Sequence, residues 1–358
     1  MLFLATLLLV GLSLVMIYSA SAVMAEEKYE QPYFFLIKQA MWVVIGMALL
    51  WAAMRVDYRH YREPVFIWSA LGIVAVALVA VLFSPERNNA RRWFSIGGLG
   101  IQPSELAKLS AIFFTAALLE RRRHRINELR YALVPIGLVL TTLIGLILVE
   151  PDFGTSASLA LIAVVMIFAA GLNYRYVVGL ALVALPALYI VVMGSAYRRR
   201  RTLAFLNPWE DPLGDGFQII QSLIAIGTGG VWGKGLMNGV QKLFYLPEPH
   251  TDFIYSVIAE ELGLVGATAV VLCFCLVTWR GLRVALSAPD SFGAFLALGV
   301  TTMIAAQAFV NISVVLGLMP TNGLPLPFVS AGGSSLVINL VGMGILLNVS
   351  QHTSSAEA

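Results

Sequence analysis

Residues 131–149 read YALVPIGLVLTTLIGLILV and contain no Asp, Glu, Lys or Arg. A helix needs about 17–25 mostly apolar residues to cross the hydrocarbon core of a bilayer. From residue 291 to residue 356 the chain again lacks these four residue types, which leaves room for two more crossings. The sequence therefore predicts an all-α polytopic membrane protein. Other runs free of these residues are 1–25, 64–85, 153–174, 176–197 and 262–279.

The composition of the whole chain excludes a water-soluble globular protein. Hydrophobic residues make up 59% of it and charged residues 12%, whereas a soluble domain has about 45–50% and about 25%. The net charge of +3 is small and spread over short loops, so membrane lipids are the expected surroundings and nucleic acid is not an expected partner. Cys273 and Cys275 lie two positions apart in an apolar run, where a helix points them in different directions, so we interpret them as packing residues.

Ten transmembrane helices fit the hydrophobic pattern. The first 25 residues end in small residues, as a signal peptide does, but they lack a basic start and exceed its apolar length of about 7–15 residues, so we interpret them as the first span. One membrane domain is expected over residues 1–358, with a large extracytoplasmic loop at about 195–255 between helices 7 and 8. The predicted spans are 2–22, 34–54, 64–83, 101–119, 131–149, 155–171, 176–194, 256–278, 292–317 and 333–350.

The distribution of Lys and Arg predicts the orientation. An even number of spans places both termini on one side, and cytoplasmic short loops carry an excess of Lys and Arg. The loops on the side of the termini hold eleven such residues, and the opposite short loops hold five. Both termini are therefore expected in the cytoplasm. The eleven are Arg55, Arg59, Arg62, Arg121, Arg122, Arg123, Arg125, Arg130, Arg175, Arg280 and Arg283; the five are Lys28, Lys38, Arg87, Arg91 and Arg92.

The long loop contains a further amphipathic segment. Such a loop is too long for the charge rule to apply, although it begins with the basic run 198–201. Its residues 217–232, FQIIQSLIAIGTGGVW, are apolar at helical spacing, and we expect a helix that lies in the outer membrane interface. The apolar face is expected to contain Ile219, Ile220, Leu223 and Ile224, with Gln218, Gln221 and Ser222 elsewhere.

Polar and ionisable groups are expensive at membrane depth, so each such group is a candidate for function. The first candidate segment is IGGLGIQPSELAK, residues 96–108, where Pro103 can open a helix and Glu105 and Lys108 share one helical face. One interpretation is an ion pair that merely neutralises the helix for insertion. The other is a site in which Lys108 meets an anionic substrate while Glu105 holds it in place.

The second candidate segment is LPEPHTDFIYSVIAEELG, residues 246–263. Acidic residues and His250 crowd there directly before a predicted span. Asp252 precedes the apolar residues, where a carboxylate can be partly desolvated and can serve as a base. A helix-capping role for Asp252 is the alternative, and both roles are compatible.

The third candidate segment is LMPTNGLPLPFVSAGGSS, residues 318–335, between the last two predicted spans. Its three prolines and three glycines rule out a continuous helix. Irregular backbone near a membrane is tolerated only where protein or water satisfies it. We therefore expect this segment to line a cavity; an ordinary external turn is the alternative, but the segment is long and apolar for one.

Other common site chemistries have little support. The sequence has no GxxxxGK[ST] phosphate-binding loop and no HExxH zinc motif, and its four histidines are scattered along the chain. The glycine-rich residues 227–235 do not follow a strand, so they indicate no nucleotide site.

Five segments together resemble the SEDS family (shape, elongation, division and sporulation) of bacterial membrane proteins. They cover the chain from the third loop to the last span. The resemblance implies ten helices in the bacterial cytoplasmic (inner) membrane with both termini in the cytoplasm, which agrees with the span count. The segments are ARRWFSIGGLGIQPSELAK at 90–108, EPDFGTS at 150–156, LNPWEDPLGDGFQIIQS at 206–222, LPEPHTDFIYSVIAEELG at 246–263 and LPLPFVSAGGSS at 324–335.

The resemblance also implies an activity and partners. Members of the family are peptidoglycan glycosyltransferases that polymerise lipid II into glycan strands beside a class B penicillin-binding protein. The family's essential loop aspartate matches Asp252, and the Glu and Lys of its fourth span match Glu105 and Lys108. Pro325 in GLPLPF resembles the RodA branch, which implies the cell-elongation machinery and rod shape, over the FtsW branch.

The implied chemistry needs a base for the acceptor hydroxyl and positive charge for the departing diphosphate. One inverting displacement suffices, because the donor is α-linked and the product β-linked. We assign Asp252 as the base and Arg91, Arg92 and Lys108 to the diphosphate, with Glu105 orienting Lys108. A divalent cation such as Mg²⁺ or Mn²⁺ could share this work, although no DxD sequence presents itself as its ligand. Further substrate contacts are expected from Gln102, Ser104, Glu248, His250, Thr251, Ser330, Gly332 and Gly333.

Two other functions fit the same features. Ten spans with buried charges also suit a lipid II flippase, and the chain could be a non-catalytic scaffold for a penicillin-binding protein. The acid and base candidates gather on one membrane face, whereas a transporter would place them near the bilayer midplane. The distribution of candidates therefore favours catalysis.

Overall fold

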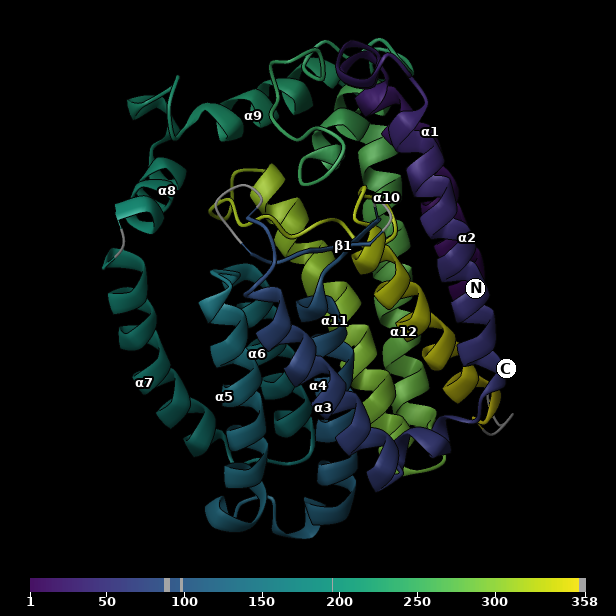
Figure 1. Ribbon diagram of the computed structural model, residues 1–358, viewed down its shortest axis with the longest axis vertical. Helices are drawn as coiled ribbons and strands as arrows, with labels where there is room; N and C mark the ends of the chain where they lie inside the picture. Colours follow the sequence, from purple (N-terminus) through teal and green to yellow (C-terminus); the bar gives the residue numbers. More distant parts are fainter. Residues whose placement is uncertain (87–90, 97–98, 195, 354–358) are drawn as a thin grey trace.

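The computed structural model describes residues 1–86, 91–96, 99–194 and 196–353. Helices account for almost all of the regular structure, and one short antiparallel hairpin pairs Phe94 with Ile101. The elements are α1 (Leu2–Tyr29), α2 (Phe34–Arg55), α3 (Pro64–Val81), β1 (Phe94–Ile96), β2 (Leu99–Ile101), α4 (Pro103–Arg122), α5 (Val134–Val149), α6 (Phe153–Ala169), α7 (Tyr174–Met193), α8 (Ala196–Leu206), α9 (Phe217–Gly229), α10 (Ile254–Ser287), α11 (Ser291–Val315) and α12 (Gly333–Gln351) (Figure 1).

The predicted fold class, an all-α polytopic membrane protein, is confirmed. Seven helices of the described chain are long and apolar enough to cross a membrane, namely α1, α2, α3, α5 with the turn before it, α10, α11 and α12. The remaining three predicted spans coincide with α4, α6 and α7. The helix α4 carries Glu105, Lys108 and Glu120, whereas α6 and the apolar part of α7, Tyr174–Ala184, are shorter. The total of ten crossings therefore stays a prediction.

The centre of the bundle is formed by α4, α11 and α12, in each of which most residues are buried inside the protein. The helix α12 packs along α2, and α11 packs against α4, α6 and α10. Glycines permit the closest approach between α12 and α2. A Cβ atom on Gly344 would lie 2.5 Å from the backbone oxygen of Leu50, so only glycine fits there.

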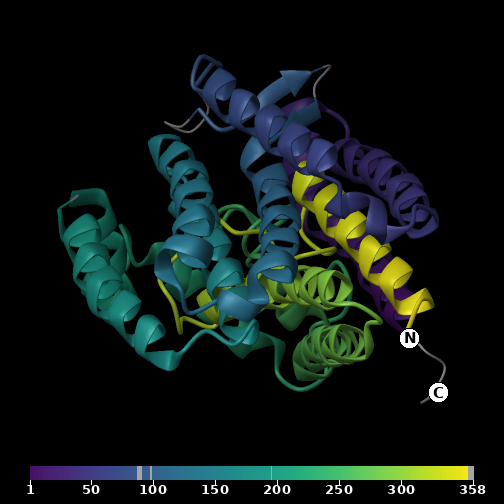
Figure 2. The same cartoon turned by 90° about the horizontal axis from the view of Figure 1, so that it is seen from below.

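The helices α7, α8 and α9 form an arch at one edge of the bundle, with α9 crossing its upper end (Figure 1). The view from below again places α7 at the edge (Figure 2). Met1 contacts Arg280 near the end of α10 that lies away from α9 (Figure 1). The end of α12 lies at the same end of the bundle, where His352 packs on Tyr58 and Tyr58 packs on Phe292 at the start of α11, as an even number of crossings requires.

The helix predicted at 217–232 is present as α9 and ends at Gly229, but its faces differ from the expectation; its position in the membrane interface stays a prediction. Ile219 and Ile220 are buried, whereas 36% of Ile224 is exposed. Ser222, which we expected away from the apolar face, is fully buried, and its Oγ lies 2.7 Å from Ser256 Oγ and 2.6 Å from the Val315 carbonyl oxygen. The reason is that α9 rests on α10 and α11, so its inner face follows polar partners on those helices.

The helix α10 is broken at Gly263, which has φ 66° and ψ −164°. The sequence had suggested an unbroken span from residue 256. The glycine-rich loop after α9 satisfies the backbone groups freed by the break: the amides of Lys234 and Gly235 donate to residues 260 and 261, and the Leu264 amide donates to Gly230. Two glycines of this loop permit the close backbone contact, since a Cβ on Gly229 or Gly233 would collide with the backbone of α10.

Candidate functional site

Two of the three candidate segments meet directly. The Ser330 hydroxyl donates a 2.6 Å hydrogen bond to the carbonyl of Thr251, and the Ala331 amide donates one of 2.9 Å to the carbonyl of His250. The third segment, at the start of α4, joins them where the Gln102 amide donates to Ser334 Oγ at 3.2 Å. Residues far apart in the sequence therefore form one polar region at the ends of α4, α10 and α12.

Asp252 lies in the turn before α10 and is half-buried. That helix begins after Phe253 without a side-chain cap, so the Asp252 carboxylate is not used for capping. Burial and, to a smaller extent, the negative charge of Glu248 raise its pKa from 3.8 to about 6, while the charge of Arg201 acts in the opposite direction. A Cβ on Gly323, whose φ is 76°, would lie 3.6 Å from Asp252 Oδ2, so the 318–332 loop closely approaches the carboxylate.

The neighbours of Asp252 are organised by a tight turn. Glu248 is exposed, has φ 53°, and accepts a 3.1 Å hydrogen bond from the Thr251 hydroxyl. His250 is buried against the ring of Phe35, with 4.5 Å between ring centroids. Burial lowers the pKa of His250, so its imidazole is neutral at pH 7. Its Nδ1 has no hydrogen-bond partner within the described parts of the chain.

Glu105 and Lys108 form the predicted ion pair, with 3.0 Å between Lys108 Nζ and Glu105 Oε1. Both side chains are buried, and Lys108 is fully inaccessible to solvent. The second donor contact of Lys108 is to Gln307 Oε1 at 2.8 Å. Lys108 does not reach the surface in this conformation, so a direct contact with the substrate stays a prediction.

The predicted residues Gln102 and Ser104 converge on Asp152, which sequence reasoning missed as a site residue. Gln102 Nε2 donates to Asp152 Oδ2 at 2.8 Å, and the Ser104 hydroxyl donates to the same oxygen at 3.3 Å. Asp152 also caps α6 by accepting from the Thr155 amide at 3.2 Å. The pattern DFGT, an Asp three residues before Thr at a helix start, is the sequence feature that could have identified the cap.

The two arginines assigned to the diphosphate contact residues that follow α3 and α5. Arg91 pairs with Glu86 at 3.0 Å, and Arg92 Nε donates to the carbonyl of Glu150 at 2.9 Å. No contact in the described chain joins either of them to Lys108. Glu150 is buried with both carboxylate oxygens unpartnered among the described residues, and burial raises its pKa to about 8.

The two glycines predicted to touch substrate begin α12. Gly332 precedes the helix, and a Cβ on Gly333 would lie 2.3 Å from Trp42 Nε1. Close packing on α2 therefore accounts for Gly333, and a substrate contact by either glycine stays a prediction.

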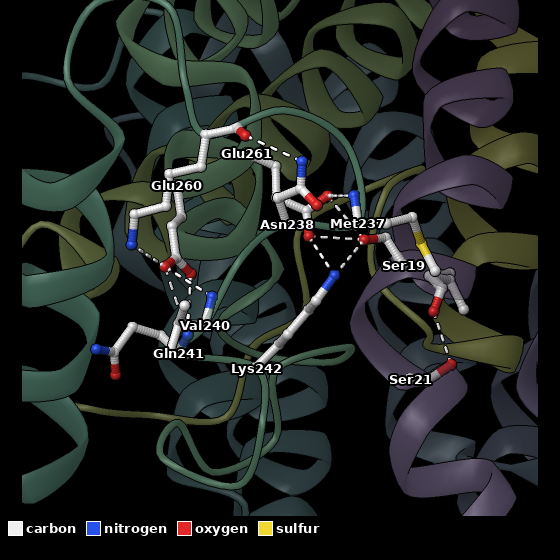
Figure 3. A network of polar contacts seen from close by, with 11 residues as sticks. Ser19, Ser21, Met237, Asn238, Val240, Gln241, Lys242, Glu260 and Glu261 are labelled. Atoms are coloured by element: carbon white, nitrogen blue, oxygen red, sulfur yellow. Dashed lines mark hydrogen bonds and ion pairs between the residues drawn. The ribbon is translucent and has the colours of Figure 1, made fainter.

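A second polar cluster, built on two adjacent carboxylates of α10, holds the loop between α9 and α10 in place (Figure 3). Glu260 accepts from Lys234 Nζ at 2.7 Å and from the backbone amide of Val240 at 2.9 Å. Glu261 accepts from Lys242 Nζ at 2.5 Å and from the Ser19 hydroxyl at 2.7 Å. The cluster fixes the loop residues 234–242 to α10.

A metal site receives no support from side-chain grouping. Within the described residues, no three or more His, Cys, Asp or Glu side chains lie together in an arrangement that could hold an ion.

The comparisons with known proteins agree with this architecture. Residues 1–355 match the family described as cell cycle protein, which comprises FtsW, RodA and SpoVE. The chain is 46% identical to a probable peptidoglycan glycosyltransferase FtsW of Geobacter metallireducens over 94% of its own length and 90% of that protein. It is 44% identical to stage V sporulation protein E of Bacillus subtilis over 97% of its length and 95% of that protein.

Solved structures share the fold. The crystal structure of the rod shape determining protein RodA of Thermus thermophilus superposes with a TM-score of 0.73 at 29% identity, covering 99% of this chain and 97% of that one. A chain from a structure described as a peptidoglycan synthase complex that coordinates polymerization and crosslinking superposes with a TM-score of 0.80 at 32% identity, covering 99% and 98%. Because both the family match and these relatives extend over nearly the whole sequence, the chain belongs to the SEDS family of FtsW, RodA and SpoVE proteins.

Proposed function

We propose that the chain is a peptidoglycan glycosyltransferase that polymerises lipid II, with Asp252 as the general base. The observation that carries the proposal is the Asp252 carboxylate itself: it is half-buried, is not used as a helix cap and has a pKa of about 6. Such a group is ionised at pH 7 yet basic enough to accept a proton from a hydroxyl. The relatives named as probable peptidoglycan glycosyltransferases support the same reaction class.

The proposed reaction is one inverting displacement at the anomeric carbon of the donor sugar. The 4-hydroxyl oxygen of the acceptor forms the new glycosidic bond while the bond between that carbon and the diphosphate oxygen breaks. The diphosphate leaves with the electron pair, and the hydroxyl proton passes to Asp252. The nearby charge of Arg201 offers stabilisation to the leaving group, together with Arg91 and Arg92 if substrate draws them from their present contacts.

The proposed orientation places Asp252 on the outer side of the cytoplasmic membrane with both termini inside. The excess of Lys and Arg in the loops near the termini supports this placement. A class B penicillin-binding protein is the proposed partner, because a structural neighbour belongs to a complex that couples polymerization to crosslinking.

For the cellular role we propose peptidoglycan synthesis in cell division or sporulation. Relatives named FtsW share 38–46% identity with the chain and stage V sporulation protein E shares 44%, whereas the RodA structures share 28–29%. The elongation role that Pro325 predicts is the alternative. Depletion of the protein distinguishes them, because loss of division gives filaments and loss of elongation gives rounded cells.

The decisive experiment is lipid II polymerisation by purified protein in detergent, followed by gel analysis of the glycan product. Wild-type protein is expected to polymerise, and Asp252→Asn is expected to be inactive while unfolding at the same temperature. Asp57→Asn, which alters a carboxylate in the loop after α2, serves as the active control. Polymer formation by Asp252→Asn would show that Asp252 is not the general base. Lipid transfer across vesicles without polymer would favour the flippase, and partner binding alone would favour the scaffold.

A further inference from the structure

Two buried amides lie one helical turn apart on α11, at the depth of the polar region. Gln307 and Asn311 are 0% and 1% exposed and face the same side of the helix. A buried amide in a membrane helix is costly unless hydrogen bonds satisfy it. Their partners therefore indicate why the chain carries them in an otherwise apolar segment.

Asn311 bridges the Asp252 turn and the loop that follows α11. Its Nδ2 donates to the backbone carbonyl of Asp252 at 2.8 Å and to that of Leu324 at 2.8 Å. Both hydrogens of the amide nitrogen are used in this way. The backbone position of Asp252 is thus fixed relative to α11 by a single side chain.

Gln307 connects the same loop to the ion pair on α4. Its Oε1 accepts from Lys108 Nζ at 2.8 Å, and its Nε2 donates to the Pro325 carbonyl at 2.8 Å and to Ser335 Oγ at 3.2 Å. An ammonium group can only donate, so Lys108 determines which end of the Gln307 amide faces it. The Nε2 group must then face the carbonyl of Pro325, next to the Leu324 carbonyl that Asn311 binds.

We propose that Gln307 and Asn311 are positioning residues, through which the buried Glu105–Lys108 ion pair sets the place of the Asp252 carboxylate. The path runs from Lys108 to Gln307, through the consecutive carbonyls of Pro325 and Leu324, to Asn311 and Asp252. It gives Lys108 an influence on the reaction without contact between its ammonium and the substrate. The proposal rests on the proposed function of Asp252 as base.

Two substitutions test the path. Gln307→Glu keeps the volume and the acceptor for Lys108 but loses the donor to Pro325, and Asn311→Leu loses both donors. Each is expected to lower kcat for lipid II polymerisation about tenfold or more, as small displacements of a reacting group do, with KM changed much less. The acidic limb of the pH–rate profile is also expected to move to lower pH, because a loosened Asp252 turn exposes the carboxylate to water.

A matched control is available at the other end of the bundle. Asn348 is a buried amide of α12 that donates to the Met54 carbonyl at 2.8 Å and accepts from the Tyr58 amide at 2.9 Å. Asn348→Leu removes the same kind of contacts, so it is expected to lower the unfolding temperature while leaving kcat and the acidic limb of folded protein unchanged.

The outcomes separate this inference from the function on which it rests. Wild-type kcat and an unmoved acidic limb in Gln307→Glu and Asn311→Leu, with Asp252→Asn inactive, would overturn the positioning role alone. Activity in Asp252→Asn would overturn the proposed base itself. If Asn311→Leu does not fold, Gln307→Glu decides, and failure of that variant to fold as well would mark both amides as purely structural.

Discussion

The hydroxyl of Ser330 donates a 2.6 Å hydrogen bond to the carbonyl of Thr251, the residue before Asp252. The hydroxyl oxygen of Ser330 also accepts a 2.8 Å hydrogen bond from the Leu326 amide. One serine therefore closes its own loop and attaches that loop to the Asp252 turn. The contact joins two candidate segments that the sequence could only place separately.

Removal of this hydroxyl is expected to reduce both stability and activity. Ser330→Ala leaves the Thr251 carbonyl and the Leu326 amide without their partner, at a cost of about 1–3 kcal/mol for unsatisfied buried groups. The unfolding temperature in detergent should fall, and the polymerisation rate of the folded fraction should fall with it. A variant as stable and active as wild type would show that the loop is held by other contacts.

The polymerisation rate is expected to rise with pH through about pH 6. A general base must be ionised, and the pKa of Asp252 is about 6 because of burial and the charge of Glu248. Initial rates between pH 4.5 and 8 measure this acidic limb of the pH–rate profile. Glu248→Gln removes the neighbouring charge, so it should shift the limb to lower pH; an unmoved limb would contradict an electrostatic influence of Glu248 on the base.

Glu150→Gln is expected to stabilise the protein increasingly as the pH rises. The pKa of this carboxyl is about 8 in the folded chain and 4.5 ordinarily. Between these values the unfolded chain has lost the proton while the folded chain retains it, so wild-type stability falls with pH. Unfolding temperatures of both proteins from pH 5 to pH 8 measure the difference. A difference that shrinks as the pH rises would reverse the sign and refute the assignment.

Breaking the buried ion pair between Lys242 of the loop and Glu261 of α10 is expected to be strongly destabilising. Lys242→Met leaves Glu261 charged and fully buried, and loss of one partner of such a pair costs about 3–5 kcal/mol. Thermal unfolding in detergent measures the loss, and Lys242→Met combined with Glu261→Gln should recover part of it.

The exposed pair of Arg125 and Glu128 gives the matched control for that measurement. Both side chains are more than half exposed, and surface pairs contribute about 0–1 kcal/mol. Arg125→Met should therefore change the unfolding temperature little. An equal effect of Lys242→Met and Arg125→Met would show that burial does not determine the strength of the Lys242–Glu261 pair.

The helices could be predicted from the sequence because their cause is local. Each apolar run must satisfy its backbone internally to enter the bilayer, so runs such as 292–317 and 333–350 predict α11 and α12 to within two residues. The candidate segments were found for a related reason, since ionisable groups such as Lys108 stand out against apolar surroundings.

The partners of those groups depend on how the helices and loops pack, so the sequence could not predict them. The break at Gly263 depends on a loop about 30 residues earlier in the chain, and the inward face of Ser222 depends on Ser256. Likewise, no periodicity indicates that Asn311 binds the carbonyl of Asp252. Apolar burial is non-directional and follows from the local run of residues. A hydrogen bond requires two atoms within about 3 Å in the right direction, which only the packed bundle determines.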